Sequence, residues 1–277
     1  MNTRTVVHRV RGMPTSDGAG VSLTRVIGQP ALSMLDPFLL LDEFGSDRPG
    51  DYIAGFPEHP HRGFETVTYM LDGRMRHGDN QGNSGLLTAG SVQWMTAGRG
   101  IVHSEMPEQE EGLMRGFQLW VNLPARDKMT DPRYQDIAPE RIPEVDPADG
   151  VHVRVIAGRF GGVTGPVSGV VTEPVYLDIA LQPGAALTVP LPDGHNAFAY
   201  VFDGEDVHLG ADVLNHRELA VLSSEGEVTL RAGSHAARLL LVAGKPLKEP
   251  VARYGPFVMN HERQIHEAIA DFQAGRF

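Results

Sequence analysis

Residues 55–73 read GFPEHPHRGFETVTYMLDG, and this stretch decides the fold. Its second part, FETVTYML, collects the β-branched and aromatic residues typical of a strand and ends at an Asp-Gly turn. Its first part holds His59 and His61 two positions apart, and on a strand residues at this spacing point to the same face. The stretch therefore predicts a β-structure into which two imidazoles project together.

The rest of the chain also consists of short strand-like runs separated by turn residues. Its 277 residues include 32 Gly and 20 Pro, and between them lie short runs rich in Val, Leu, Thr and aromatic residues. Clear examples are SVQWMTA (91–97), RGFQLWVNL (115–123), VHVRVIAG (151–158) and ARLLLVAG (237–244). This pattern is typical of an all-β sandwich or barrel.

One segment predicts a helix, and it lies at the C-terminus. Ile265, Ile269 and Phe272 recur at helical spacing, Asn260 suits the N-cap, and Gly275 follows the end. We expect a short amphipathic helix that packs its apolar stripe on the second barrel.

The length favours two domains. The loop-like, proline-rich stretch from Pro124 to Gly150 places the boundary, so we expect one domain over residues 1–135 and another over 136–277. A weak internal repeat, TYMLDGRMRH (68–77) and AYVFDGEDVH (199–208), supports two barrels of similar plan. This alignment places Pro190, Pro192 and Asn196 opposite His59, His61 and Glu65. We therefore expect a second, degenerate domain without metal.

Composition excludes several classes of site and partner. The chain has no Cys, which removes Cys-ligated zinc, iron–sulfur clusters and thiol nucleophiles. With 24 Lys and Arg against 35 Asp and Glu, the net charge of −11 opposes direct nucleic-acid binding. No apolar run has the length of a signal peptide or a membrane span, so we expect a cytoplasmic protein with no membrane association.

A second acid–imidazole pair, His103 and Glu105, follows the glycine turn AGRG (97–100) and has the same two-residue spacing. Three imidazoles and a carboxylate suit a divalent transition metal with open positions for substrate or water. His59 and His61 alone are as consistent with buried, hydrogen-bonded histidines as with ligands, and the second pair favours metal. Strand parity does not choose the carboxylate, because Glu65 shares the parity of His59 and His61.

Residues 55–73 and GSVQWMTAGRGIVHSE (90–105) resemble the two metal motifs of the cupin superfamily. More narrowly, the chain resembles the pirin family from about Val6 to the C-terminus. The segments that carry this resemblance are LDPFLLLDEF (35–44), HPHRGFETVTY, GSVQWMTAGRGIVHSEMP, FQLWVNLPARDKMTDPRYQ and YGPFVMNHERQI.

The pirin resemblance implies two cupin barrels, each a double-stranded β-helix or jelly roll, in one chain. It implies one metal per chain, in the N-terminal barrel, with the ligands His59, His61, His103 and Glu105. Two departures from the general cupin pattern are themselves pirin-like: four residues separate Gly98 from His103, and the carboxylate ligand follows that histidine. The expected metal is Fe(II), and Mn, Co, Ni, Cu or Zn also suit the ligand set.

The same resemblance implies a quercetin 2,3-dioxygenase activity. An open metal would bind a flavonol or a similar enol substrate, with O2 as co-substrate, and Glu105 would act as the catalytic proton acceptor. The alternative is a redox-sensitive regulatory protein that binds a transcription factor or a metabolic enzyme. The net charge opposes direct DNA binding but leaves a protein partner open.

Overall fold

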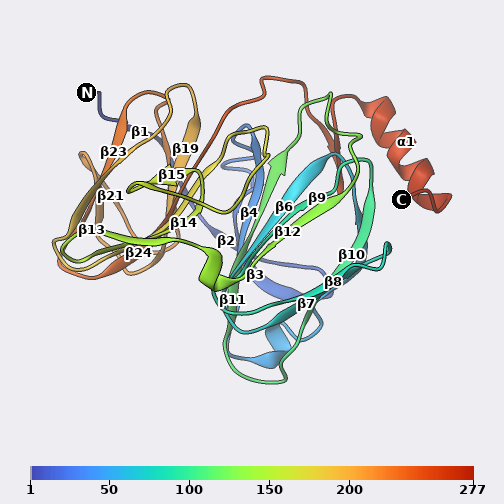
Figure 1. The fold of residues 1–277 in the computed structure, drawn as a ribbon, viewed down its shortest axis with the longest axis horizontal. Coiled ribbons are helices and arrows are strands. Elements are labelled where there is room, and N and C mark those ends of the chain that lie inside the picture. The colour runs from blue at the N-terminus through green and yellow to red at the C-terminus, as the bar shows by residue number, and fades with distance from the viewer. Residues whose placement is uncertain (1) are drawn as a thin grey trace. The chain divides into compact units, whose positions relative to one another are not determined.

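A computed structural model describes residues 2–277 and shows a chain whose regular structure is mostly β-strand (Figure 1). Within this part of the chain there is one α-helix, α1 (Glu262–Gln273), together with the 3-10 turns η1 (Pro49–Asp51) and η2 (Pro139–Arg141). The all-β prediction is confirmed. The strands form two compact units. Unit 1 comprises the segment up to Gly12, Pro30–Pro37 and Glu140–Pro246, and unit 2 comprises Met13–Gln29, Phe38–Pro139 and Leu247–Phe277.

Unit 2 contains two antiparallel sheets and a short hairpin of β25 (Ala252–Tyr254) and β26 (Phe257–Met259). The larger sheet consists, in spatial order, of β12 (Arg133–Ile137), β9 (Val92–Thr96), β6 (Phe64–Asp72), β11 (Met114–Asn122), β4 (Phe38–Ser46), β3 (Val21–Ile27) and β2 (Met13–Asp17). The smaller sheet consists of β5 (Phe56–His61), β10 (Ile101–Pro107), β7 (Met75–Asp79) and β8 (Ser84–Leu87).

Unit 1 also contains two antiparallel sheets and a short hairpin of β15 (Arg159–Phe160) and β16 (Val163–Thr164). The larger sheet consists of β1 (Val6–Arg11), β22 (Glu218–Leu222), β19 (Asn196–Asp203), β24 (Ala237–Gly244), β17 (Val175–Leu181), β14 (Val151–Ala157) and β13 (Glu144–Ala148). The smaller sheet consists of β18 (Ala186–Pro190), β23 (Glu227–Ala232), β20 (Val207–Leu209) and β21 (Asp212–Leu214).

The two units repeat one topology, which confirms the internal repeat predicted from the Asp-Gly turns. Strands β6 and β19 hold the third place in their seven-stranded sheets, counted from β12 and from β1, and each runs through such a turn into the smaller sheet of its unit, to β7 and β20. Gly73 and Gly204 adopt φ values of 83° and 75°, which a residue with a side chain rarely adopts. Strand β1 occupies the edge position in unit 1 that β12 occupies in unit 2.

The interiors of the two units differ in chemistry. In unit 1 the strands bury one large cluster of aliphatic side chains, including Leu177, Val201 and Leu239. In unit 2 the strands bury polar side chains as well, among them Thr68, His103 and Glu105. Because buried polar groups are costly unless they are bonded, the interior of unit 2 is where a ligand or ion would be held.

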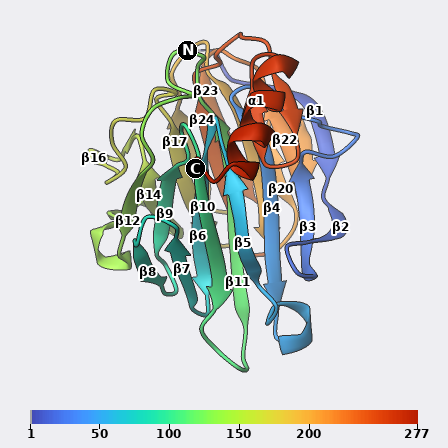
Figure 2. The ribbon, with the colours of Figure 1, turned by 90° about the vertical axis from the view of Figure 1, so that its right-hand side faces the viewer.

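The C-terminal helix was predicted to pack on the second barrel, which corresponds to unit 1, and this prediction is wrong. Helix α1, labelled in Figure 2, belongs to unit 2. It packs against β25 (Ala252–Tyr254) and β26 (Phe257–Met259). Ile265 is buried in the cluster that contains Phe257, and Asp271 accepts a 2.8 Å bond from Nη1 of Arg62. An apolar stripe predicts which face of a helix is buried but not against which strands.

The helix begins one residue later than predicted, because His261 and not Asn260 is the N-cap, in a capping box with Gln264.

The chain passes from unit 2 to unit 1 between Pro139 and Glu140. The domain ranges 1–135 and 136–277 stay a prediction.

Candidate metal centre

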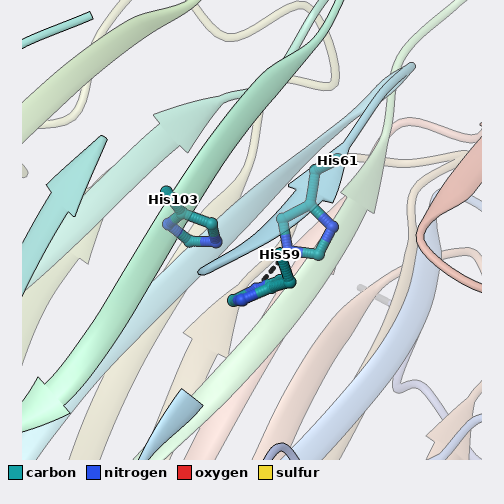
Figure 3. A group of neighbouring side chains, drawn as sticks. All are labelled: His59, His61 and His103. Atoms are coloured by element: carbon teal, nitrogen blue, oxygen red, sulfur yellow. Dashed lines mark hydrogen bonds between the residues drawn. The ribbon is translucent and has the colours of Figure 1, made fainter. Parts of the chain in front are cut away.

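Strands β5 and β10 bring three histidines together (Figure 3). His59 and His103 are direct partners in the antiparallel register, and His61 lies two residues along β5. One ring nitrogen from each of the three histidines lies within 4.8 Å of the corresponding atoms of the other two. The structure thus joins the two His-bearing pairs that sequence spacing placed only separately.

The hydrogen bonds of these rings leave ligand atoms facing one another. Nδ1 of His59 lies 2.7 Å from the carbonyl oxygen of Pro57, so that nitrogen carries the proton and Nε2 carries a lone pair. That Nε2 lies 3.0 Å from Nε2 of His61. Neither nitrogen of the buried His103 ring has a hydrogen-bond partner among residues 2–277. Unpartnered buried nitrogens are costly, and a shared metal ion would satisfy them.

Burial also favours the protonation state that metal binding needs. Burial lowers the pKa of His61 well below its usual range, and the neighbouring imidazoles of His103 and His59 lower it further. Burial lowers the pKa of His103 in the same direction. Neutral imidazole is the ligand form, so these rings need lose no proton at neutral pH to bind a cation.

Glu105 lies in β10 two residues after His103, and its side chain is buried. Its Oε1 accepts a 2.7 Å hydrogen bond from the hydroxyl of Thr68, and its Oε2 accepts a 2.7 Å bond from the amide of Gln118. The compact group of candidate ligand atoms contains the three histidines without Glu105. Its role as fourth ligand stays a prediction, and the two hydrogen bonds define where its carboxylate is held.

The side chain of Glu65 lies on the face of its sheet opposite to the face that meets Glu105. The chain turns at Gly63, where φ is +90°, so that β5 and β6 belong to different sheets and strand parity does not carry across the turn. Within β6, Thr68 points toward Glu105, and Glu65, three residues away, points to the opposite face. Glu65 instead accepts a 2.6 Å bond from the hydroxyl of Thr96, and burial raises its pKa.

Lys128 is a structural residue of this site that sequence reasoning missed. Its buried ammonium donates to the carbonyl oxygen of Gly63 at 2.7 Å, to the side chain of Asn122 at 2.6 Å and to the carbonyl oxygen of Val258 at 3.0 Å. Lys128 thereby ties the turn after the His-x-His strand to β11 and to β26. No spacing rule identifies it, because it lies in the stretch predicted as a loop.

A cavity of about 540 Å3 opens beside the histidines and is lined by His59, His61, Gln118 and Trp120. The Trp120 ring lies edge-on to His61, with 5.2 Å between ring centres, and its Nε1 donates a 3.0 Å hydrogen bond to Gln118. A cavity of this volume is suited to a small organic molecule. Such a molecule would lie against the candidate metal position.

Comparison with known proteins identifies the family of this chain. Residues 20–121 match the Pirin family, and residues 176–277 match the Pirin C-terminal cupin domain. The chain belongs to the pirin family. The two matches fall on the two halves of the internal repeat and confirm two cupin domains in one chain.

Pirin-family relatives cover the whole chain. A Pseudomonas aeruginosa protein, whose name provisionally assigns it quercetin 2,3-dioxygenase activity, is 54% identical over 98% of this chain and 97% of its own. A Caulobacter vibrioides pirin-like protein is 50% identical over 100% of both chains. A crystal structure of a quercetin 2,3-dioxygenase from Acinetobacter baumannii, 34% identical, superimposes with a TM-score of 0.92 over 100% of this chain and 99% of that one. Among residues 2–277, no helix combines the length and the apolar character that crossing a membrane requires.

Proposed function

We propose that this pirin-family chain is a metal-dependent oxygenase of the quercetin 2,3-dioxygenase type, acting on flavonols or similar enol substrates. The observation that carries the proposal is the group of His59, His61 and His103, whose ligand atoms lie within 4.8 Å of one another beside a cavity of about 540 Å3. The names of the Pseudomonas and Acinetobacter proteins support the same activity for those proteins, and we extend it here.

The donor set suits one divalent transition metal, with Fe(II) as our first choice and Mn, Co, Ni, Cu and Zn as alternatives. The residues that would hold it are His59, His61, His103 and, as the fourth ligand, Glu105. When bound, any of these metals would supply Lewis acidity toward the substrate hydroxyl, and a redox-active one would also supply electron exchange with O2. The carboxylate of Glu105, held by Thr68 and Gln118, would accept the proton that the substrate hydroxyl releases.

Other residues would exclude water and orient the substrate. Trp120 presents its ring to the cavity and to His61, while Phe44 and Phe56 line the same cavity. Aromatic walls of this kind favour a planar aromatic substrate. The Gln118 amide links the Trp120 wall to Glu105, so the wall and the proton acceptor are held in one hydrogen-bonded chain.

The experiment that tests this proposal is oxygen uptake with quercetin as substrate. Protein loaded separately with Fe, Mn, Co, Ni and Cu is compared with free metal and with the double variant His59→Ala/His61→Ala. We expect at least one metal form of the wild type to consume O2 above the free-metal rate, and the variant to show none of this excess. No excess with any of the five metals would favour the redox-sensitive regulatory alternative.

A further inference from the structure

Two arginines, Arg25 and Arg253, line the cavity beside the histidines. Arg25 forms ion pairs with neighbouring carboxylates. Its Nε and Nη2 bind the two oxygens of Asp42 at 2.9 and 2.7 Å. Its Nη2 also binds Asp17 at 2.8 Å. Asp42 binds Arg25 with both of its oxygens, and together with Asp17 the three groups carry a net charge of −1.

Arg253, on β25, is in a different position. Its guanidinium carbon lies 4.8 Å from the centre of the Trp120 ring, and its Nη1 donates a 3.2 Å bond to the carbonyl oxygen of Leu39. None of the ion pairs formed by residues 2–277 includes Arg253. A guanidinium has five N–H donors, so most of its donor capacity is open to a ligand.

The surroundings of Arg253 leave its guanidinium partly desolvated and without a bonded carboxylate. Burial lowers the pKa of Arg253, and the neighbouring positive charge of Arg25 lowers it further. Asp42 and Asp17 oppose this effect, but both already bind Arg25. A partly desolvated cation without a bonded carboxylate gains more from an anion than a cation in free solution does.

One aromatic ring separates Arg253 from the histidine centre. The Trp120 ring is edge-on to His61 on one side and carries the guanidinium of Arg253 over it. The apolar side chains of Leu40, Phe44 and Phe56 line the same cavity. Histidines of the candidate metal centre, an open guanidinium and aromatic side chains thus line one cavity.

We propose that Arg253 forms an anion-binding subsite of this cavity, and that the preferred ligand is a planar aromatic or enolic acid. Its chelating hydroxyl and carbonyl oxygens lie at the histidines, and its carboxylate forms a two-pronged hydrogen bond with Arg253. The placement of the chelating end rests on the proposed function. The subsite at Arg253 makes acidic substrates better ligands than neutral flavonols of the same shape.

The test is anaerobic calorimetric titration of the nickel-loaded protein with 3-hydroxyflavone and with its 4′-carboxylate. Without O2 the measurement reports binding alone. We expect the carboxylate to bind about 10- to 100-fold more tightly than the neutral parent in the wild type. Arg253→Gln should bring this ratio to about 1 while changing the affinity for the neutral parent less than about threefold, and Arg253→Lys should keep part of the ratio.

The matched control is Arg76→Gln, which removes an exposed arginine of β7 that binds Glu108 outside the cavity and should leave the ratio unchanged. Thermal unfolding of each variant checks that it folds. Equal affinities in the wild type, failure of the carboxylate to bind, or an equal loss of both ligands in Arg253→Gln would overturn the subsite. A preserved ratio in a protein that never consumes O2 would instead overturn the oxygenase proposal and leave the subsite standing.

Discussion

The Nε2 atoms of His59 and His61 lie 3.0 Å apart at the C-terminal end of strand β5. Because His59 donates its Nδ1 proton to Pro57, its Nε2 offers a lone pair toward His61. Two imidazole nitrogens at this distance need a proton or a cation between them. With His103 opposite His59 in the register, a metal ion is the occupant that serves all three rings.

We predict a metal content of one ion per chain. Among residues 2–277, the His59, His61 and His103 cluster is the group of three side chains whose ligand atoms converge. Elemental analysis of the purified protein after reconstitution and removal of loosely bound metal measures the ratio. A value near two would show that a second site exists.

The double change His59→Ala with His61→Ala should abolish metal binding and leave the fold intact, because a chain of this size has a large core without the ion. Metal analysis and circular dichroism are the two readouts. The control is the double change His152→Ala with His208→Ala, since both of these rings are partly exposed and belong to unit 1. Full metal retention in the first variant, or equal loss in the second, would contradict the assignment.

The two buried carboxylates should differ in their effect on the metal. Glu105→Gln should change the coordination spectrum of the metal-loaded protein, whereas Glu65→Gln should leave it unchanged, because Glu65 points away from the histidines and binds Thr96. Both changes keep the side-chain shape, so each is the control for the other. Electronic absorption of the Co(II) form is the measurement, and the reverse outcome would make Glu65 the ligand.

Lys128→Met should lower the free energy of unfolding by about 2 kcal/mol near neutral pH, because three buried oxygens lose their donor. Burial lowers the pKa of Lys128 from its ordinary 10.5 to about 7. Between these values the unfolded chain holds more protons on Lys128 than the folded chain does. The contribution of Lys128 to stability should therefore rise from about pH 7 toward pH 10 and be constant below pH 7.

Urea denaturation of the wild type and of Lys128→Met at several pH values measures this effect. Subtracting the free energy of unfolding of the variant from that of the wild type cancels the contributions of the other titrating groups. A difference in the free energy of unfolding that stays constant or falls between pH 7 and pH 10 would show that the folded state keeps Lys128 charged over this range.

The histidine pairs could be predicted because strand parity is a local property. His59 and His61 lie within one continuous strand, as do His103 and Glu105, so their common faces follow from spacing alone. That β5 pairs with β10, with His59 opposite His103, depends on contacts between distant segments. Family resemblance, and not spacing, predicted that the two pairs meet.

Other features depended on backbone turns and long-range packing. The parity argument for Glu65 failed because the chain turns at Gly63 and β6 enters another sheet. The docking of helix α1 was mispredicted because Arg62 and Asp271, which are 209 residues apart in sequence, meet only in the fold. Arg253 directly precedes the segment YGPFVMNHERQI, but no spacing rule assigns it a role, and its place in the cavity follows from the packing of β25 against Trp120.

The most direct test of the proposed function is carbon monoxide release during aerobic incubation of the metal-loaded protein with quercetin. Oxygenolytic cleavage of a flavonol ring should release about one carbon monoxide per flavonol consumed by the wild type, and His59→Ala/His61→Ala should release none above the free-metal background. Flavonol consumption without carbon monoxide, or equal release from the variant, would contradict oxygenation at the three-histidine centre.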